Sequence, residues 1–388
     1  MHTNRFRYYL LTALNSFGTT LFFYYFYFFT QRELGFDNRS NLWLAALQGA
    51  VYAMASWRAG RIAERLGYER SLCLGLILLG ACLVSGLVVC RPFLHVWILV
   101  GATLGVCFTW PALEALVNHG ENRVGIQRNV GLYNVVWAGT GAVAYFAGGV
   151  LLESLGMRAL YLLPLGIVGL ELALVANVAL RPNGRTGADP SEFSPLHTAL
   201  LPCPGRTLLR MAWLANPFAY MAIQTLVALM PAIATRLGLS TASAGVCGSL
   251  WCFSRLGAFA LLCVWAGWHY RARWLIAAYG TMSLSFVCIL LTSALEVLVI
   301  AQLFFGAALG LIYYSSLFYS MDVSQAKATH GGIHEAAIGL GNLLGPLVGA
   351  IGLHLAPSRP ELSAIAVTIL LAAGGLALIT QMRLTPRM

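Results

Sequence analysis

A few ionisable side chains stand inside long apolar stretches of this sequence, where a charge is costly. Arg255 lies near the middle of one stretch and Glu171 lies comparably deep in another, while Glu114, Glu335 and Arg58 lie about one helical turn from the ends of theirs. A charged side chain at the centre of a bilayer costs about 2.5–3.5 kcal/mol on insertion scales, so each of these groups needs a partner or a water-filled cavity.

Two interpretations of these groups follow from that cost. In the structural one, they form fixed ion pairs, Arg58 with Glu114 and Arg255 with Glu335. In the functional one, they bind a charged group of a solute or carry protons, because intramembrane Glu and Arg residues often mark such pathways. Glu114, Arg255 and Glu335 are therefore our candidates for coupling the movement of a solute to that of protons.

The segment His330-Gly-Gly-Ile-His334-Glu335 could in principle hold a metal ion at the start of a helix. A zinc protease would need the pattern H-E-x-x-H, whereas His334-Glu335 is followed by Ala-Ala-Ile. We therefore expect no metal, no cofactor and no catalytic residues. The interpretation that we favour is that these residues line the inner mouth of a cavity or pair with Arg255.

The elements that must position these groups are twelve apolar stretches of membrane-spanning length. Hydrophobic residues make up 59% of the 388 residues, charged residues only 10%, and the mean hydropathy is +0.74. A bilayer core of about 30 Å needs about 20 apolar residues in a helix, and helices satisfy their own backbone. The sequence predicts an all-α membrane protein with spans at 8–29, 41–61, 71–90, 94–117, 130–152, 158–180, 208–235, 242–266, 273–292, 296–320, 331–354 and 361–382.

The orientation follows from the 24 Lys and Arg residues, most of which fall in loops on the same side as the N-terminus. The positive-inside rule then predicts that both termini are cytosolic in a multi-pass protein of the cell membrane, with the lipid bilayer as partner. The net charge of +10 is spread over these loops, so no nucleic acid partner is expected.

A polar interruption at 181–207 divides the spans into two similar halves. Gly101-Ala-Thr-Leu-Gly105 resembles Gly306-Ala-Ala-Leu-Gly310, and other short matches share the same offset of about 200 residues. The sequence therefore predicts an N-terminal six-helix bundle at 1–180, a cytosolic linker at 181–207 and a C-terminal six-helix bundle at 208–388.

The segment after the second predicted span carries a known motif. Residues 60–70 read G-R-I-A-E-R-L-G-Y-E-R, with the main positions at Gly60, Glu64, Arg65, Gly67 and Arg70. This is similar to the signature of the major facilitator superfamily (MFS) of transporters, with Glu64 in place of the usual Asp and with Tyr68 and Glu69 at usually basic positions. The resemblance implies the MFS fold, two pseudo-symmetric six-helix bundles, and a loop that controls the switch between outward and inward states.

A second motif of that family lies on an unexpected helix. Its spacing, G-x8-G-x3-G-P-x2-G, resembles the antiporter motif of the fifth helix, but here it falls on the eleventh span, at Gly332, Gly341, Gly345, Pro346 and Gly349. Glycines allow close helix packing and proline bends a span, which would suit a helix that rocks between the halves. Because the motif is transposed, we do not infer antiport.

The resemblance also implies which helices face the cavity, namely the first, fourth, seventh and tenth. With the fifth span and Arg255 added, the expected substrate cavity consists of Asn15, Trp110, Glu114, Tyr133, Asn134, Tyr220, Gln224, Arg255, Gln302, Tyr314 and Tyr319. Aromatic platforms with few charges suit an amphipathic or weakly charged organic molecule. For the aromatic run from Phe22 to Phe29 we expect mainly an interfacial belt, and for Glu171 packing or snorkelling.

The sequence thus predicts a monomeric secondary active transporter that moves a small organic solute by alternating access, with proton coupling as a hypothesis. A transporter-like solute sensor and a membrane-embedded enzyme are the alternatives, and the enzyme is not expected. Within transporters, efflux of drugs or lipophilic compounds and uptake of a sugar or organic acid both stay open.

Overall fold

Each of the twelve apolar stretches forms a helix. The computed structural model describes residues 2–89, 91–118, 123–179, 203–323, 327–357 and 361–383. The helices are α1 (His2–Leu34), α2 (Asn38–Leu66), α3 (Tyr68–Val88), α4 (Pro92–Asn118), α5 (Arg123–Leu155), α6 (Ala159–Ala179), α7 (Cys203–Arg236), α8 (Thr241–Val264), the short 3-10 helix η2 (Ala266–Trp268), α9 (Ala272–Leu291), α10 (Leu295–Val323), α11 (Lys327–Leu355) and α12 (Glu361–Arg383). No strand occurs in these ranges, so the predicted all-α class is confirmed.

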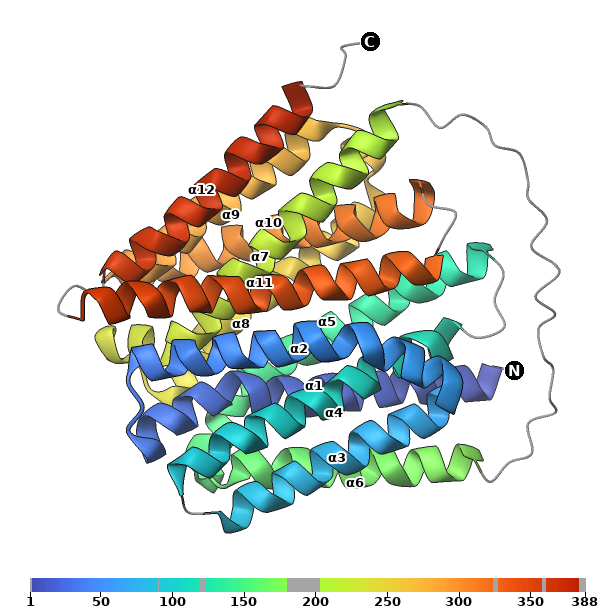
Figure 1. Cartoon of the computed structure of the whole chain (residues 1–388), viewed down its shortest axis with the longest axis vertical. Helices are drawn as coiled ribbons and strands as arrows, with labels where there is room; N and C mark the ends of the chain where they lie inside the picture. Colours follow the sequence, from blue (N-terminus) through green and yellow to red (C-terminus); the bar gives the residue numbers. More distant parts are fainter. Residues whose placement is uncertain are drawn as a thin grey trace.

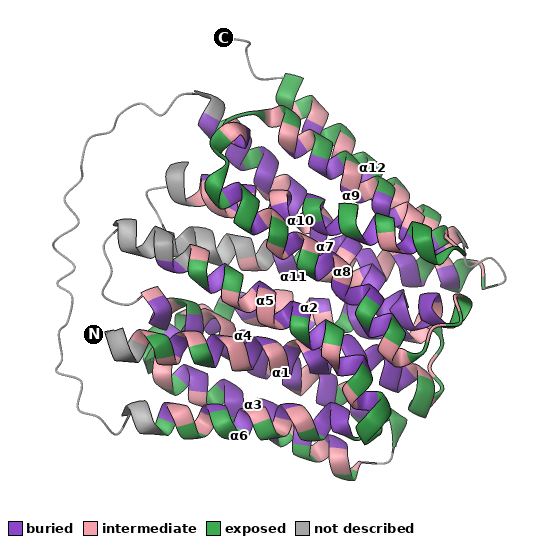
Figure 2. Ribbon diagram, turned by 180° about the vertical axis from the view of Figure 1, so that it is seen from behind, coloured by how far each residue is buried: buried purple, intermediate pink, exposed green. Residues whose placement is uncertain are grey.

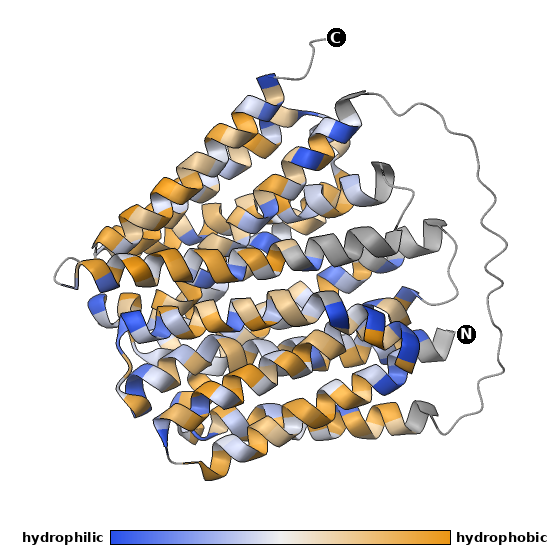
Figure 3. Ribbon diagram, viewed as in Figure 1, coloured by the Kyte–Doolittle hydropathy of each residue, from blue (hydrophilic) through white to orange (hydrophobic). Residues whose placement is uncertain are grey.

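The surface of the helices is that of a membrane protein. Ten of them are long and apolar enough to cross a bilayer, while α1 and α2 are less hydropathic because they carry tyrosines, amides and, in α2, several arginines. Large apolar side chains point outward, such as Ile77 at 58% exposed and Ile369 at 64% exposed. Figures 2 and 3 show the outer faces as exposed and largely apolar, which is the pattern that lipid requires.

The helices form two sets that meet along two helix pairs. In the first set α3 packs on α4 and α6, and in the second α10 packs on α8 and α9 (Figure 1). The sets touch where α2 packs on α11 and where α5 packs on α8. The predicted linker at 181–207 lies outside the described residues up to 202, and α7 begins at Cys203.

Glycines allow the two sets to come into backbone contact. A Cβ atom at Gly49 of α2 would collide with the backbone of Asn342 on α11, and one at Gly149 of α5 would collide with the backbone of Thr241 on α8. Both contacts lie toward the α1–α2 and α7–α8 connections, at the end of the molecule opposite the chain termini (Figure 1).

The transposed glycine motif serves a different contact from the one expected. Gly341 and Gly345 face the backbones of Pro217 and Met221, so they pack α11 on α7 within one set. Gly349 lies near Leu42 of α2 and Ser363 of α12, Pro346 lies within α11, and the surroundings of Gly332 lie outside the described residues. Contact between the sets involves Gly349, through Leu42, and a neighbouring glycine outside the motif, Gly339, against Ala53.

The MFS-like loop is a one-residue turn between α2 and α3. Gly67 has φ of +92°, a conformation that residues with a side chain rarely adopt, and it ends α2 and starts α3. Gly60 lies in the last turns of α2, and the side chains of Glu64, Arg65 and Arg70 are exposed. Tyr8 of α1 donates a hydrogen bond to Glu69 Oε1 at 3.0 Å, which ties the loop to the first helix.

The aromatic run on α1 does not form the expected interfacial belt. All of its members from Phe22 to Phe29 except Phe23 are at most 8% exposed, because α4, α5, α6 and α7 surround α1. The rings pack on one another and on neighbouring helices, as Tyr24 does on Tyr145 with ring centroids 3.8 Å apart. The belt interpretation is therefore wrong: α1 is a central helix, and its aromatic residues form core.

Glu171 of α6 is packed inside the protein rather than snorkelling to an interface. It is 1% exposed, and its Oε1 atom has no hydrogen-bond partner. A buried polar atom without a partner costs about 1–3 kcal/mol.

We expect Glu171→Leu to raise the thermal melting temperature of the purified protein while solute binding is unchanged. The control is Glu296→Leu, at an exposed position of α10, which should leave melting unchanged; a lower melting temperature for Glu171→Leu would contradict the prediction.

Candidate functional site

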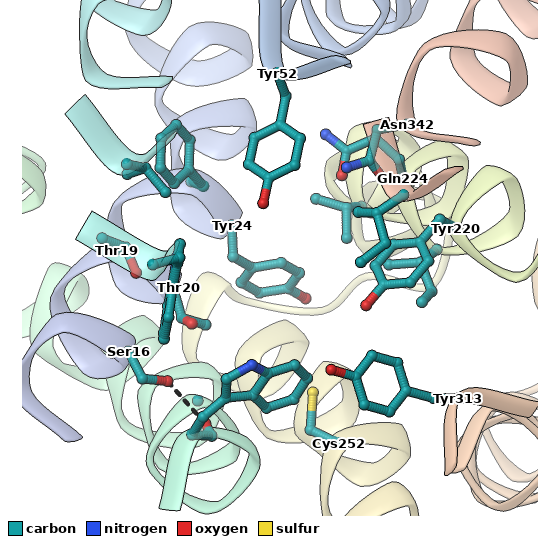
Figure 4. Close-up of a pocket in the computed structure, with 18 of the residues that line it drawn as sticks. Ser16, Thr19, Thr20, Tyr24, Tyr52, Tyr220, Gln224, Cys252, Tyr313 and Asn342 are labelled. Carbon is teal, nitrogen blue, oxygen red and sulfur yellow. Dashed lines mark hydrogen bonds between the residues drawn. The ribbon is translucent and has the colours of Figure 1, made fainter. Parts of the chain in front are cut away.

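A cavity of about 300 Å³ lies between the two helix sets and is lined by both. Four phenol hydroxyl groups converge on it, those of Tyr24 from α1, Tyr52 from α2, Tyr220 from α7 and Tyr313 from α10 (Figure 4). Opposite them, Ser16 donates a hydrogen bond of 2.7 Å to the Trp137 carbonyl, which ties α1 to α5. The wall is thus aromatic with many hydroxyl groups, as expected for a pocket that orients a small organic molecule.

Arg255 is the positive charge of this cavity. It lies on α8, is 9% exposed, and its guanidinium carbon lies 4.5 Å from the ring centroid of Trp137 and 4.8 Å from that of Trp251. Trp137 belongs to α5 and Trp251 to α8, so the cation contacts an indole from each of the two helix sets. The expected ion pair with Glu335 is wrong, since no carboxylate of the described residues lies within 4.0 Å of Arg255.

Two carboxyl groups line another part of the cavity wall. Glu335 of α11 accepts a hydrogen bond of 2.5 Å from the Tyr52 hydroxyl of α2, across the boundary between the sets. Glu114, near the end of α4, lines the same cavity and its side chain is exposed. The expected Arg58–Glu114 pair is also wrong within the described part of the chain, where Arg58 is an exposed residue of α2 without an ion pair.

The end of the cavity remote from the chain termini is closed by hydrogen bonds between helices of both sets. Tyr27 of α1 donates to Gln48 Oε1 of α2 at 2.7 Å, and Gln224 Nε2 of α7 donates to the same oxygen at 2.9 Å. Between α5 and α8, the backbone amide of Ala242 on α8 donates a hydrogen bond of 2.9 Å to Glu153 Oε1 on α5. Glu114 lies on the cavity wall near the end of α4 that is on the same side as the chain termini.

Most of the sequence-predicted site residues line the cavity and four do not. On the wall are Trp110, Glu114, Tyr133, Asn134, Tyr220, Gln224, Arg255 and Glu335. The structure places Asn15 in the protein interior, Gln302 in a separate small space behind Trp251, Tyr314 against Cys263 at 3.2 Å, and Tyr319 against the Tyr270 amide at 3.1 Å. For Asn15 and Tyr314 the predicted helix lines the cavity, but the neighbouring residue, Ser16 or Tyr313, faces it instead.

Sequence reasoning missed a larger group, mainly on α2, α5, α8 and α11. Its principal members are Tyr24, Gln48, Tyr52, Trp137, Tyr145, Trp251, Tyr313 and Asn342. One signal was present: Trp251 lies four residues before Arg255, and residues four apart share a helix face.

The metal site that residues 330–335 could in principle form, and that we did not expect, stays untested. Among the described residues no three His, Cys, Asp or Glu side chains could together hold a metal ion, and the side chains of His330 and His334 lie outside those residues.

Comparison with known proteins identifies one family and several solved structures with a similar fold. A family model described as Major Facilitator Superfamily matches residues 8–259. No curated protein matches. Among solved structures, a proton-dependent oligopeptide transporter is 14% identical over 98% of each chain with a TM-score of 0.72. The nucleoside transporter NupG is 13% identical, covering 98% of this chain and 99% of that one, with a TM-score of 0.73.

A bacterial homolog of the human lysosomal transporter Spinster, in an inward-facing and unoccupied conformation, is also similar. It is 14% identical, with 98% of this chain and 95% of that one covered and a TM-score of 0.69. At these identities the likeness concerns the fold alone.

Proposed function

The chain belongs to the Major Facilitator Superfamily, and from that premise we propose that it is a secondary active transporter that moves a small organic solute by alternating access. The observation that supports this most directly is the central cavity, which both helix sets line and which is closed at one end. A site enclosed by two bodies can be exposed to either side by rocking one body against the other.

The rocking bodies in this proposal are the two six-helix bundles at 1–180 and 208–388. They meet along α2–α11 and α5–α8, where glycines permit sliding backbone contact. The MFS-like loop with Gly60, Glu64, Arg65, Gly67 and Arg70 would control the switch, and its bond from Tyr8 to Glu69 would hold one state. We place the protein in the cell membrane as a monomer with both termini in the cytosol.

Coupling to protons is part of the same proposal. Glu114 and Glu335 are carboxyl groups on the cavity wall, and Glu335 bonds across the two sets to Tyr52. A carboxyl group whose hydration changes as the bundles move would take up a proton on one side and release it on the other. The charge of these groups would then depend on which end of the cavity is open.

The test is a flux measurement with purified protein in liposomes. A thermal-shift screen of metabolites and drugs would first find a ligand, since a ligand that binds only the folded form raises its apparent stability. That ligand, radiolabelled, should then exchange across the liposome membrane and accumulate under a pH gradient. Binding without flux would support a sensor instead, and chemical conversion of the ligand would support an enzyme. The gradient direction that drives accumulation separates uptake from efflux.

A further inference from the structure

Arg255 is placed to receive a negative group from the solute. Its guanidinium carbon lies over two indole rings, 4.5 Å from the centroid of Trp137 and 4.8 Å from that of Trp251. Its Nε atom is buried and has no hydrogen-bond partner. A guanidinium edge matches a carboxylate in shape and charge, because two parallel N–H groups can donate to two oxygens.

The two indoles do not by themselves explain a charge at this position. A cation on an aromatic face gains about 0.5–2 kcal/mol, but the contact leaves the N–H donors unsatisfied. Donors in a buried site favour an acceptor, and none of the carboxylates in the described ranges lies within 4.0 Å of this one. The two indoles hold the guanidinium at the cavity wall while its buried Nε has no partner, which suits an anion site.

The rest of the wall indicates what the anionic group is attached to. Aromatic rings of Trp110, Tyr133, Tyr145 and Tyr313 border the cavity, with Trp110 and Tyr133 edge to face at 6.4 Å between centroids. Such walls suit a flat apolar body. One arginine rather than several suits a single negative charge, and a volume of about 300 Å³ lies at the small end for ligand pockets.

Resting on the transport function proposed above, we propose that the solute is a small aryl or similarly flat carboxylate, a monoanion. Its carboxylate binds the edge of Arg255 beside the two indoles, and its apolar body lies against the aromatic wall. The carboxyl groups of Glu114 and Glu335 then stay free to exchange protons with water.

The test compares carboxylates with their neutral amides on the purified full chain in nanodiscs. The probes are benzoate with benzamide and indole-3-acetate with indole-3-acetamide, titrated by calorimetry. We expect at least one carboxylate to bind about tenfold or more tightly than its amide, the difference that one charge-assisted pair contributes. If no carboxylate binds, or if the amides bind equally well, the proposal is overturned; this arm needs no variant.

Variants then assign the effect to the residue. Arg255→Gln should remove the preference for the carboxylate, while Arg255→Lys, which keeps the charge without the planar edge, should retain part of it. Arg158→Gln removes an exposed charge outside the cavity and is the matched control, with the preference unchanged. A full preference in folded Arg255→Gln overturns the proposal. If Arg255→Gln does not fold, the carboxylate affinity of Arg255→Lys is the deciding measurement. An affinity equal to that of the unchanged protein would contradict binding through the planar guanidinium.

Failure of this inference and failure of the transport function give different results. If a neutral or cationic solute is transported and Arg255→Gln transports it normally, the carboxylate site is wrong and the transporter stands. If carboxylates bind through Arg255 but never cross the membrane, the site stands and the transport function is wrong.

Discussion

Replacing Glu335 and Glu114 by glutamine should abolish accumulation driven by a pH gradient while solute exchange across the membrane continues. Glutamine keeps the size and hydrogen-bonding capacity of the side chain but cannot take up and release a proton at these pH values. Exchange moves solute both ways without net proton movement, so it does not need the carboxyl groups. We expect gradient-driven uptake in proteoliposomes to fall at least about tenfold in the double variant, a loss of about 1.4 kcal/mol or more in driving force or barrier.

The matched control is Glu296→Gln, which removes an exposed carboxyl group at the start of α10, outside the cavity. It should accumulate solute like the unchanged protein. Normal gradient-driven uptake by the double variant would show that protons are not coupled through these two residues. Loss of exchange together with uptake would instead assign them to solute binding.

A valine at Gly49 should have an equally large effect, for a different reason. A Cβ atom there would enter the backbone of Asn342, so α2 and α11 could no longer close against each other. Overpacking of a tight contact costs about 1–3 kcal/mol, enough to shift an equilibrium between two states by about fivefold to 150-fold. We expect the closed end to separate and transport to fall to background.

The separation can be measured between spin labels at Arg39 and Ser243, which lie near the start of α2 and of α8 at the closed end. The distance should lengthen in Gly49→Val. Gly166→Val of α6 is the control, because nothing lies within 4 Å of a Cβ atom at that position. An unchanged distance with full transport in Gly49→Val would mean that this contact does not hold the closed state.

The sequence predicted the helices well because lipid imposes a simple constraint. Every span must satisfy its own backbone and present apolar side chains, so the length and composition of each stretch define it. Only α1 was misread in detail, since its aromatic run looks the same whether lipid or protein surrounds it. Contact with several other helices makes it core, and no local pattern reports those contacts.

The site was predicted to the right helices but not to the right faces. On α1 and α10 the predicted residues Asn15 and Tyr314 are adjacent to Ser16 and Tyr313, which line the cavity. One residue along a helix is a rotation of 100°, and in helices polar on several sides the sequence does not determine the orientation. The ion pairs failed for a related reason: opposite charges at similar depth do not indicate that other groups, such as Trp137 or Tyr52, lie nearer.

The contacts of Arg255 with two indoles make the cation sensitive to the distance between α5 and α8. One of these rings, Trp137, belongs to the first six-helix set and the other, Trp251, to the second. Any motion that parts these helices at this depth would separate the guanidinium of Arg255 from the Trp137 ring and admit water to it. Binding of an anion at Arg255 and the angle between the two bundles should therefore depend on each other. Both should change the tryptophan fluorescence of this protein.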